Sequence, residues 1–175
     1  EATDNTLDLA IQGKGLFQIL LPDGTTAFTR DGTFQLDGTG LIVTHDGYQV
    51  QPGITIPSTA IDVTINNSGE VQVKLEGQTA LSTVGQLQLA TFLNDAGLEA
   101  IGDNLYLETP ASGTATAGNP ASTGFGSILQ GFLETSNVNA VEEISNLISA
   151  QRAYEMNSKV IQTSDEMLGT LTAMR

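Results

Sequence analysis

The sequence predicts a mainly β protein, with an antiparallel β-domain of short strands followed by one long C-terminal α-helix. All five prolines lie at or before Pro120 and eighteen of the 19 glycines at or before Gly131, and neither type occurs from Phe132 to Leu168. The first part shows short alternating runs between turns, whereas the last part repeats apolar residues at helical spacing. We therefore expect a β-rich domain over residues 1–133 and a helix over residues 137–175.

Asp-Gly dipeptides punctuate the beginning of the β-rich part. Asp-Gly favours the hairpin turn in which both central residues take positive φ, which Gly adopts freely and Asp tolerates better than most residues. Each dipeptide therefore predicts a hairpin turn. They are Asp23-Gly24, Asp31-Gly32, Asp37-Gly38 and Asp46-Gly47.

Between the turns, apolar and polar residues alternate with period two, which predicts antiparallel strands with one face exposed to water. The apolar members of these runs are Phe34 and Leu36; Leu41 and Val43; Ile61, Val63 and Ile65; Val71, Val73 and Leu75; Leu87 and Leu89; and Leu105 and Leu107.

Residues 109–124 read TPASGTATAGNPASTG, without a charge or a large apolar side chain. Such a segment buries too little apolar surface to offset its ordering entropy. It is predicted to be a flexible surface loop within the β-rich domain.

The C-terminal helix is predicted to begin at a capping box made by Asn139 and Glu142. Two rows of residues then recur every seven positions and form the a and d seam of a heptad pattern. A β-domain of this size cannot bury a helix of ~50 Å along its whole length, so the seam predicts a helical partner. The seam residues are Ala140, Leu147, Ala150, Tyr154, Asn157, Ile161, Ser164, Leu168 and Leu171.

Charge and composition exclude several functions. The chain has 175 residues, with 20 acids against 6 bases and a net charge of −14, which argues against binding nucleic acid or an anionic membrane surface. No apolar run approaches the ~18 residues of a membrane-spanning helix. Without cysteine there is no disulfide, thiol nucleophile or thiolate metal site. Residues 1–136 carry 15 acids and 3 bases, and residues 137–175 carry 5 and 3, so the β-domain holds nearly all the excess charge.

Two motifs could suggest catalysis. His45, the one histidine, precedes Asp46-Gly47 and is interpreted as an exposed turn residue, because no strand–nucleophile–helix elbow accompanies it. Gly13-Lys14-Gly15 lacks the spacing of a phosphate loop and is interpreted as a turn between two strands. No catalytic residue and no cofactor-binding residue is predicted.

Acidic residues likewise predict no metal site. Asp31, Asp37 and Asp46 lack the spacing of a calcium loop and are assigned to hairpin turns. Glu142-Glu143 and Asp165-Glu166 are neighbours on a helix, so their side chains point to different faces and cannot form a catalytic pair. We interpret them as solvated.

Residues 7–52, 92–113 and 124–168 resemble flagellar rod and hook proteins, a family of axial structural proteins. The most specific motifs are Ser136-Asn137-Val138-Asn139 and Gln151-Arg152-Ala153-Tyr154-Glu155. Within the family, the core and spacing resemble distal rod members most, with proximal rod members next. Hook members usually carry a larger inserted outer domain.

The resemblance implies a non-enzymatic subunit that is exported unfolded through the flagellar type III apparatus. It implies assembly with its own copies into a periplasmic rod of the basal body, which transmits torque from motor to hook. The expected partners are other copies and other rod, hook and ring proteins, with no membrane insertion. Family members pair an N-terminal helix with the C-terminal one; this chain lacks such a helix, so we expect it to be a fragment.

Two positions depart from the family pattern: Asp95 stands where Pro is expected, and Gly169 falls inside the last helical turns. Two functions of other classes stay open. One is an acidic, calcium-dependent surface adhesin, which predicts loss of stability in EDTA. The other is a hydrolase that depends on His45.

Overall fold

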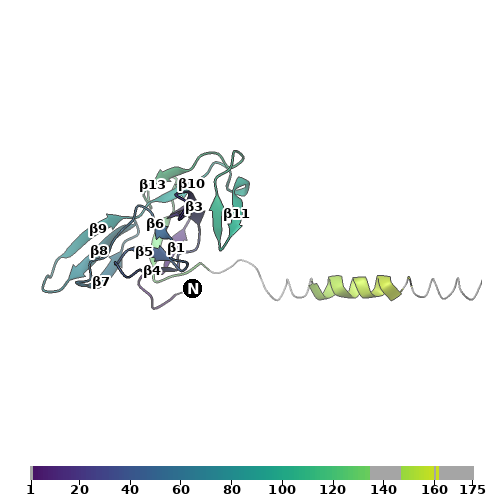
Figure 1. Cartoon of the computed structure of the whole chain (residues 1–175), viewed down its shortest axis with the longest axis horizontal. Helices are drawn as coiled ribbons and strands as arrows, with labels where there is room; N and C mark the ends of the chain where they lie inside the picture. The colour runs from purple at the N-terminus through teal and green to yellow at the C-terminus, as the bar shows by residue number, and fades with distance from the viewer. Residues whose placement is uncertain (1, 135–146, 160, 162–175) are drawn as a thin grey trace, which may run out of the picture. The chain divides into compact units, whose positions relative to one another are not determined.

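The computed structural model describes residues 2–134, 147–159 and 161 (Figure 1). Contacts divide the chain into two units, Glu1–Thr135 and Ser136–Arg175. The described part of the first unit consists of antiparallel strands, and the described part of the second is helical. The predicted fold class, a β-domain followed by a C-terminal helix, is confirmed.

The strands of the β-domain are β1 (Leu9–Gln12), β2 (Leu16–Leu20), β3 (Thr26–Thr29), β4 (Phe34–Leu36), β5 (Ile42–Thr44), β6 (Gln49–Val50), β7 (Ala60–Ile65), β8 (Glu70–Leu75), β9 (Leu81–Gln86), β10 (Leu89–Thr91), β11 (Glu99–Gly102), β12 (Leu105–Leu107), β13 (Thr116–Gly118) and β14 (Ser127–Gln130). A 3₁₀ turn, η1 (Asp95–Gly97), lies between β10 and β11.

These strands form three sheets that share one core. The largest runs in the order β11-β12-β3-β2-β6-β5-β4, and β10 pairs with both β2 and β13. A second sheet has the order β7-β8-β9, and β1 pairs with β14 in the third. Phe17 of β2, Val73 of β8 and Ile128 of β14 are each fully buried in the common core. The alternation predicted for β8 is confirmed, because Val71 and Val73 are buried while Lys74 is exposed.

Four hairpins use the same turn, at residues 21–25, 37–41, 44–48 and 66–70. The N–H of the first residue donates to the carbonyl of the fifth, and the N–H of the fourth donates to the carbonyl of the first. The fourth residue is always Gly, with φ between 80° and 87°. The Asp residues of these turns have no positive φ, so the expected turn with two left-handed residues is wrong. These are three-residue hairpin loops in which only the Gly is left-handed.

Asp31-Gly32 does not form the predicted hairpin turn. Gly32 has an ordinary φ, and its carbonyl accepts a hydrogen bond of 3.0 Å from the N–H of Leu9 at the start of β1. A Cβ atom on Gly32 would collide with the Leu9 carbonyl oxygen. Gly is needed here because two backbones touch, a requirement that comes from the tertiary fold.

The beginning and the end of the β-domain are joined. Leu9 to Gln12 of β1 pair residue by residue with Gln130 to Ser127 of β14, and Ala2 forms a further bridge with Phe132. The Gln130 side chain extends this joint to another sheet: it donates to the carbonyls of Thr6 (2.8 Å) and Val63 (2.9 Å) and accepts from the N–H of Ile65 (3.0 Å). The β1–β14 pair thus joins the first and the last strand of the described β-domain.

Residues 109–124 differ from the flexible loop that the sequence predicts. They contain β13, which pairs with β10 across Leu89↔Gly118. The Ser112 side chain is fully buried, donates to the carbonyl of Thr109 (2.9 Å) and accepts from its N–H (3.0 Å). Pro120 is also fully buried. Backbone pairing and small buried side chains hold this segment in place. The prediction considered only charged and large apolar side chains, so it missed both.

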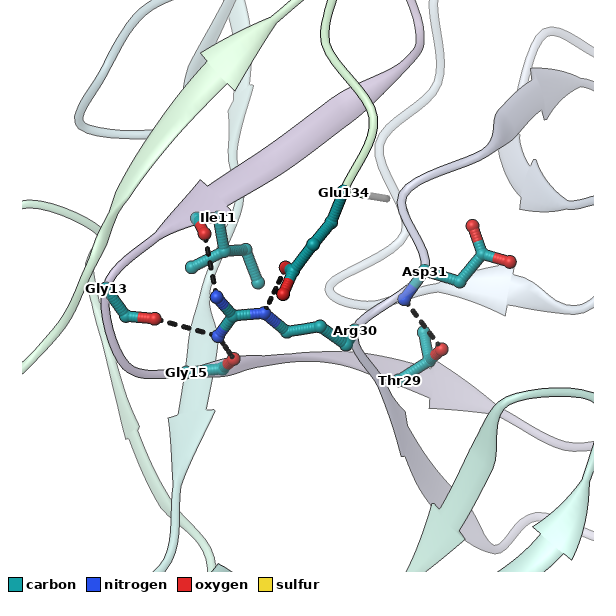
Figure 2. A network of polar contacts seen from close by, with 7 residues as sticks. All are labelled: Ile11, Gly13, Gly15, Thr29, Arg30, Asp31 and Glu134. Atoms are coloured by element: carbon teal, nitrogen blue, oxygen red, sulfur yellow. Dashed lines mark hydrogen bonds and ion pairs between the residues drawn. The ribbon is translucent and has the colours of Figure 1, made fainter. Parts of the chain in front are cut away.

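Arg30, just after β3, ties three parts of the domain together (Figure 2). Its Nη2 donates to the Ile11 carbonyl (2.8 Å), and its Nη1 to the carbonyls of Gly13 (2.8 Å) and Gly15 (3.0 Å). Its Nε donates to Oε2 of Glu134 at 2.6 Å, near the end of the described β-domain. Half-exposed ion pairs contribute roughly 0–1 kcal/mol, whereas each charged hydrogen bond to a carbonyl contributes roughly 1.5–3 kcal/mol. The three carbonyls should therefore matter more than Glu134.

We predict that Arg30→Lys lowers the free energy of unfolding by about 1–3 kcal/mol, because an ammonium group cannot reach all these acceptors in the fork geometry of a guanidinium. The matched variant Glu134→Gln keeps the shape of the partner and should cost less than about 1 kcal/mol. Urea titration of both variants measures the difference. Equal losses would show that the ion pair, not the carbonyl contacts, stabilises this junction.

We predict that Gly32→Ala destabilises the β-domain by about 1–3 kcal/mol, because the new methyl group collides with the Leu9 carbonyl and pushes β1 away. Gly38→Ala is the control within another Asp-Gly dipeptide: its φ is not left-handed and no atom lies within 4 Å of the added Cβ. It should change stability by less than about 0.5 kcal/mol or raise it slightly. Thermal melts measure both variants. Equal shifts in melting temperature would refute the claim that the close contact with Leu9 requires Gly at position 32.

Candidate assembly surfaces

The described part of the second unit is a helix at residues 147–159 and 161. Leu147, Tyr154 and Ile161 of the predicted seam have exposed fractions of 68%, 78% and 63%. Ala150 and Asn157, from the second row of the seam, are also exposed on this helix. The remaining seam and cap residues lie outside the described residues: Asn139, Ala140, Glu142, Ser164, Leu168 and Leu171.

Helical geometry places the described seam residues on one side of the helix. At roughly 100° per residue, the five positions from Leu147 to Ile161 fall within an arc of roughly 80°. Arg152, Glu155 and Lys159 lie within roughly 60° of one another on the opposite side. The helix therefore has an apolar stripe at heptad spacing, and on the opposite side its charged residues stand among the exposed Ile148 and Met156.

An exposed stripe of this size is a strong candidate for binding. Covering one large apolar side chain contributes roughly 1.5–3 kcal/mol, and Leu147, Tyr154 and Ile161 offer three of them at heptad spacing. Helices of about 15 residues are marginal alone in water, so a packed partner also stabilises the helix itself. This arrangement can associate with another helix.

Several contacts fix the position at which the chain leaves the β-domain after β14. After β14, Phe132 bridges Ala2 and Glu134 pairs with Arg30. The Gly131 N–H also donates to the Asp8 carbonyl at 2.8 Å. The last described residues before the helix are thus anchored beside the first residues of the domain.

Of the residues considered for chemistry, Asp31, His45 and Asp46 line one small pocket of about 30 Å³ together with Asp103. His45 is exposed in the turn between β5 and β6, and Gly13-Lys14-Gly15 connects β1 to β2, as predicted. Oδ1 of Asp37 accepts from Thr39 and Leu41 within its own loop. Oδ1 of Asp31 accepts from Thr33, and its Oδ2 accepts from Nδ2 of the distant Asn104 at 3.2 Å. Asp46 is exposed in a hairpin turn.

Within the described ranges, no group of three or more His, Cys, Asp or Glu residues could hold a metal ion. In the same residues, no helix is long and apolar enough to cross a membrane. Glu142-Glu143 and Asp165-Glu166 lie outside the described residues.

Two features of the surface were not predicted. Arg30 carries no sequence signal, because its partners are backbone carbonyls brought near by the fold. Ile61 was assigned to one apolar face of a strand with Val63 and Ile65, yet it is 66% exposed. The cause is a bulge in β7 between Ala60 and Asp62, which shifts the register against β8.

Comparison with known proteins identifies two matching domains. Residues 10–73 match the family described as the flagellar hook protein FlgE/F/G D1 domain, and residues 129–174 match the flagellar basal body rod FlgEFG protein C-terminal family. The first match covers most strands of the large sheet, and the second begins in β14 and includes the described helix.

Three relatives illustrate the similarity along the chain. The flagellar basal-body rod protein FlgG of Caulobacter vibrioides is 64% identical over 99% of this chain and 66% of the relative. FlgG of Bacillus subtilis is 46% identical over 100% of this chain and 67% of the relative. The flagellar hook protein FlgE of Salmonella typhimurium is 40% identical over 68% of this chain but only 29% of the relative.

The chain thus spans about two thirds of the length of the FlgG relatives it matches. The likeness to FlgG extends through β-domain and helix alike, whereas the likeness to the hook protein covers a smaller part of both sequences. The chain belongs to the FlgG family of flagellar basal-body rod proteins.

Proposed function

We propose that this chain is the structural part of a self-assembling subunit of the flagellar basal-body rod, and that it transmits torque mechanically rather than catalysing a reaction. The observation that carries the proposal is the exposed seam of Leu147, Tyr154 and Ile161 on a helix, in a chain of the FlgG family. The seam packs against helices of neighbouring copies and of other rod, hook and ring proteins. Heterologous contacts of this kind do not close and so extend into a helical array.

Within the rod, we assign the chain to the distal segment. The support is the 64% identity to a FlgG protein over nearly the whole chain, compared with 40% identity to a hook protein over 68% of it. Export through the flagellar type III apparatus into the periplasm belongs to the same proposal. A sequence without cysteine suits an unfolded chain that enters an oxidising compartment, because no thiols can cross-link on the way.

The hydrogen bonds that join the two ends of the β-domain support a mechanical function. Because β1 and β14 pair and Ala2 bridges Phe132, a segment preceding residue 2 would begin beside the segment that leads to the C-terminal helix. Two helices that depart from such a joint are positioned to pair. A force on the helices would then reach the β-domain through this hydrogen-bonded junction.

The rival functions gain no comparable support. The calcium-dependent adhesin would need clustered oxygen ligands, and in the described residues no group of three or more His, Cys, Asp or Glu side chains could hold a metal ion. Oδ1 of Asp31 and Oδ1 of Asp37 instead accept hydrogen bonds from Thr33 and Thr39. The hydrolase would need His45 hydrogen-bonded to a nucleophile. His45 is exposed in a hairpin turn and lines only a small pocket of about 30 Å³, where the hydroxyls of Thr29 and Thr33 donate to the Asn104 carbonyl and to Asp31 instead.

We predict that Tyr154→Asp weakens self-association about tenfold or more, because it places a charge in the apolar seam and removes burial worth roughly 1.5–3 kcal/mol. The melting of the β-domain should not change, because the side chain belongs to the separate helical unit. Sedimentation velocity over a concentration series measures the association, and circular dichroism measures the melt.

Ala153→Asp is the control for this prediction. Ala153 is exposed and lies roughly 100° from Tyr154 around the helix, outside the seam. Replacing Ala costs more helix propensity than replacing Tyr, so a loss caused by helix unfolding would be larger in the control. If Ala153→Asp weakened association as much as Tyr154→Asp, or if Tyr154→Asp lowered the β-domain melt, the seam would not be the assembly surface.

A further inference from the structure

The bulge in β7 exposes an apolar side chain at a defined place. In the register between β7 and β8, Ala60 pairs with Leu75 and Asp62 pairs with Lys74, so Ile61 has no partner in this ladder. Its side chain is 66% exposed although it belongs to an apolar alternating run. Bulges often re-aim a side chain next to a functional surface.

Ile61 borders a groove of about 640 Å³ between β7 and the β4–β5 turn. Leu36 at the end of β4 lines the same groove and is 40% exposed. The charged residues of the lining are Asp37 and Asp62, and the lining contains no Lys, Arg or His. Hydrogen bonds from the Thr39 hydroxyl and from the backbone N–H groups of Leu41 and Thr39 lower the pKa of Asp37, so its carboxylate is ionised at neutral pH. The groove therefore combines apolar side chains with two carboxylates, and the nearby base Lys74, the ladder partner of Asp62, lies outside its lining.

The occupant that fits this groove is apolar and basic. Another β-domain does not fit, because residues 1–136 carry 15 acids against 3 bases and two such domains repel each other. Residues 137–175 as a whole carry five acids against three bases, so the basic character is local: on the described helix, Arg152 and Lys159 stand against the single acid Glu155. On the side away from the seam, Ile148 and Met156 flank Arg152 and are 44% and 67% exposed.

We propose that the groove bordered by Ile61 and Leu36 binds the Ile148–Arg152–Met156 face of the helix of a second copy, with Arg152 facing Asp62. This inference rests on the proposed function and names a subunit contact for it. The seam then remains available for helix–helix packing, so each helix uses two faces. Because groove and helix face are different surfaces, the contact is heterologous and extends the assembly without closing it.

The test uses disulfide cross-linking, which is clean here because the chain has no cysteine. One tagged chain carries Ile61→Cys and a second, differently tagged chain carries Met156→Cys. The control partner carries Ser158→Cys, an exposed position on the opposite side of the helix from Met156. Mixed chains are oxidised under assembly conditions, and cross-linked products are identified by mass spectrometry. Sedimentation of the same samples reports assembly.

We expect the 61–156 disulfide, between the Ile61→Cys and Met156→Cys chains, to exceed the 61–158 disulfide of the control pair several-fold. The reason is that a disulfide requires Cβ atoms about 3.5–4.5 Å apart. Adding Asp62→Lys to the first chain should lower the yield, and adding Arg152→Asp to the second should restore it. High salt should reduce the original product, because the pair is solvent-accessible.

Equal yields from both partners would overturn the inference. A product formed within one chain of a monomeric Ile61→Cys/Met156→Cys double variant, without a mixed product, would also overturn it. Assembly without the 61–156 disulfide would refute the groove contact while leaving the proposed rod function intact. Absence of both product and assembly would count against the groove contact and the seam together.

Discussion

The pairing of β1 with β14 is the constraint on which the rest of the β-domain depends. It brings residues 9–12 against residues 127–130, and the Gln130 side-chain amide donates further hydrogen bonds to the carbonyls of Thr6 and of Val63 in β7. Arg30 reinforces it by binding carbonyls at the end of β1 and just after it, together with the carboxylate of Glu134. Because β1 and β14 are the first and last strands of the described β-domain, the other strands all lie within the loop they close. The cost in loop-closure entropy is offset by a core shared among all three sheets.

The two units differ in charge and in exposed apolar surface. The β-domain contains nearly all the excess negative charge, which keeps such domains apart in solution, while the helix is close to neutral and exposes apolar residues. In the proposed assembly, association is directed to the helix, whose seam and opposite side offer distinct surfaces. A mechanical subunit needs this division: a stable domain that resists local opening and a helix that gains its packing from neighbours.

Patterns in short stretches of sequence predicted the features of the fold that depend on neighbouring residues. The alternation around Val71 and Val73 predicted a strand, and the absence of Gly and Pro from Phe132 to Leu168 predicted a helix after the β-domain. Both are present because near neighbours determine such features, whereas the predicted limits of the helix lie outside the described residues. Such patterns could not predict contacts between segments that lie far apart in the sequence. Gly32 is required by the Leu9 backbone, and Ile61 leaves its alternating run at a bulge set by pairing with β8. The helix seam stays a prediction, since packing against a partner is a property of the assembly.

Hydrogen–deuterium exchange of the chain, compared below and above its association concentration, tests the account most directly. The backbone amides of β1 and β14 should exchange only through global unfolding in both states, because their pairing closes the domain. The amides of residues 147–161 should exchange rapidly in the dissociated chain and become protected on assembly. Early exchange of β1 and β14, or equal protection of the helix in both states, would contradict a closed domain that presents an unpaired helix for assembly.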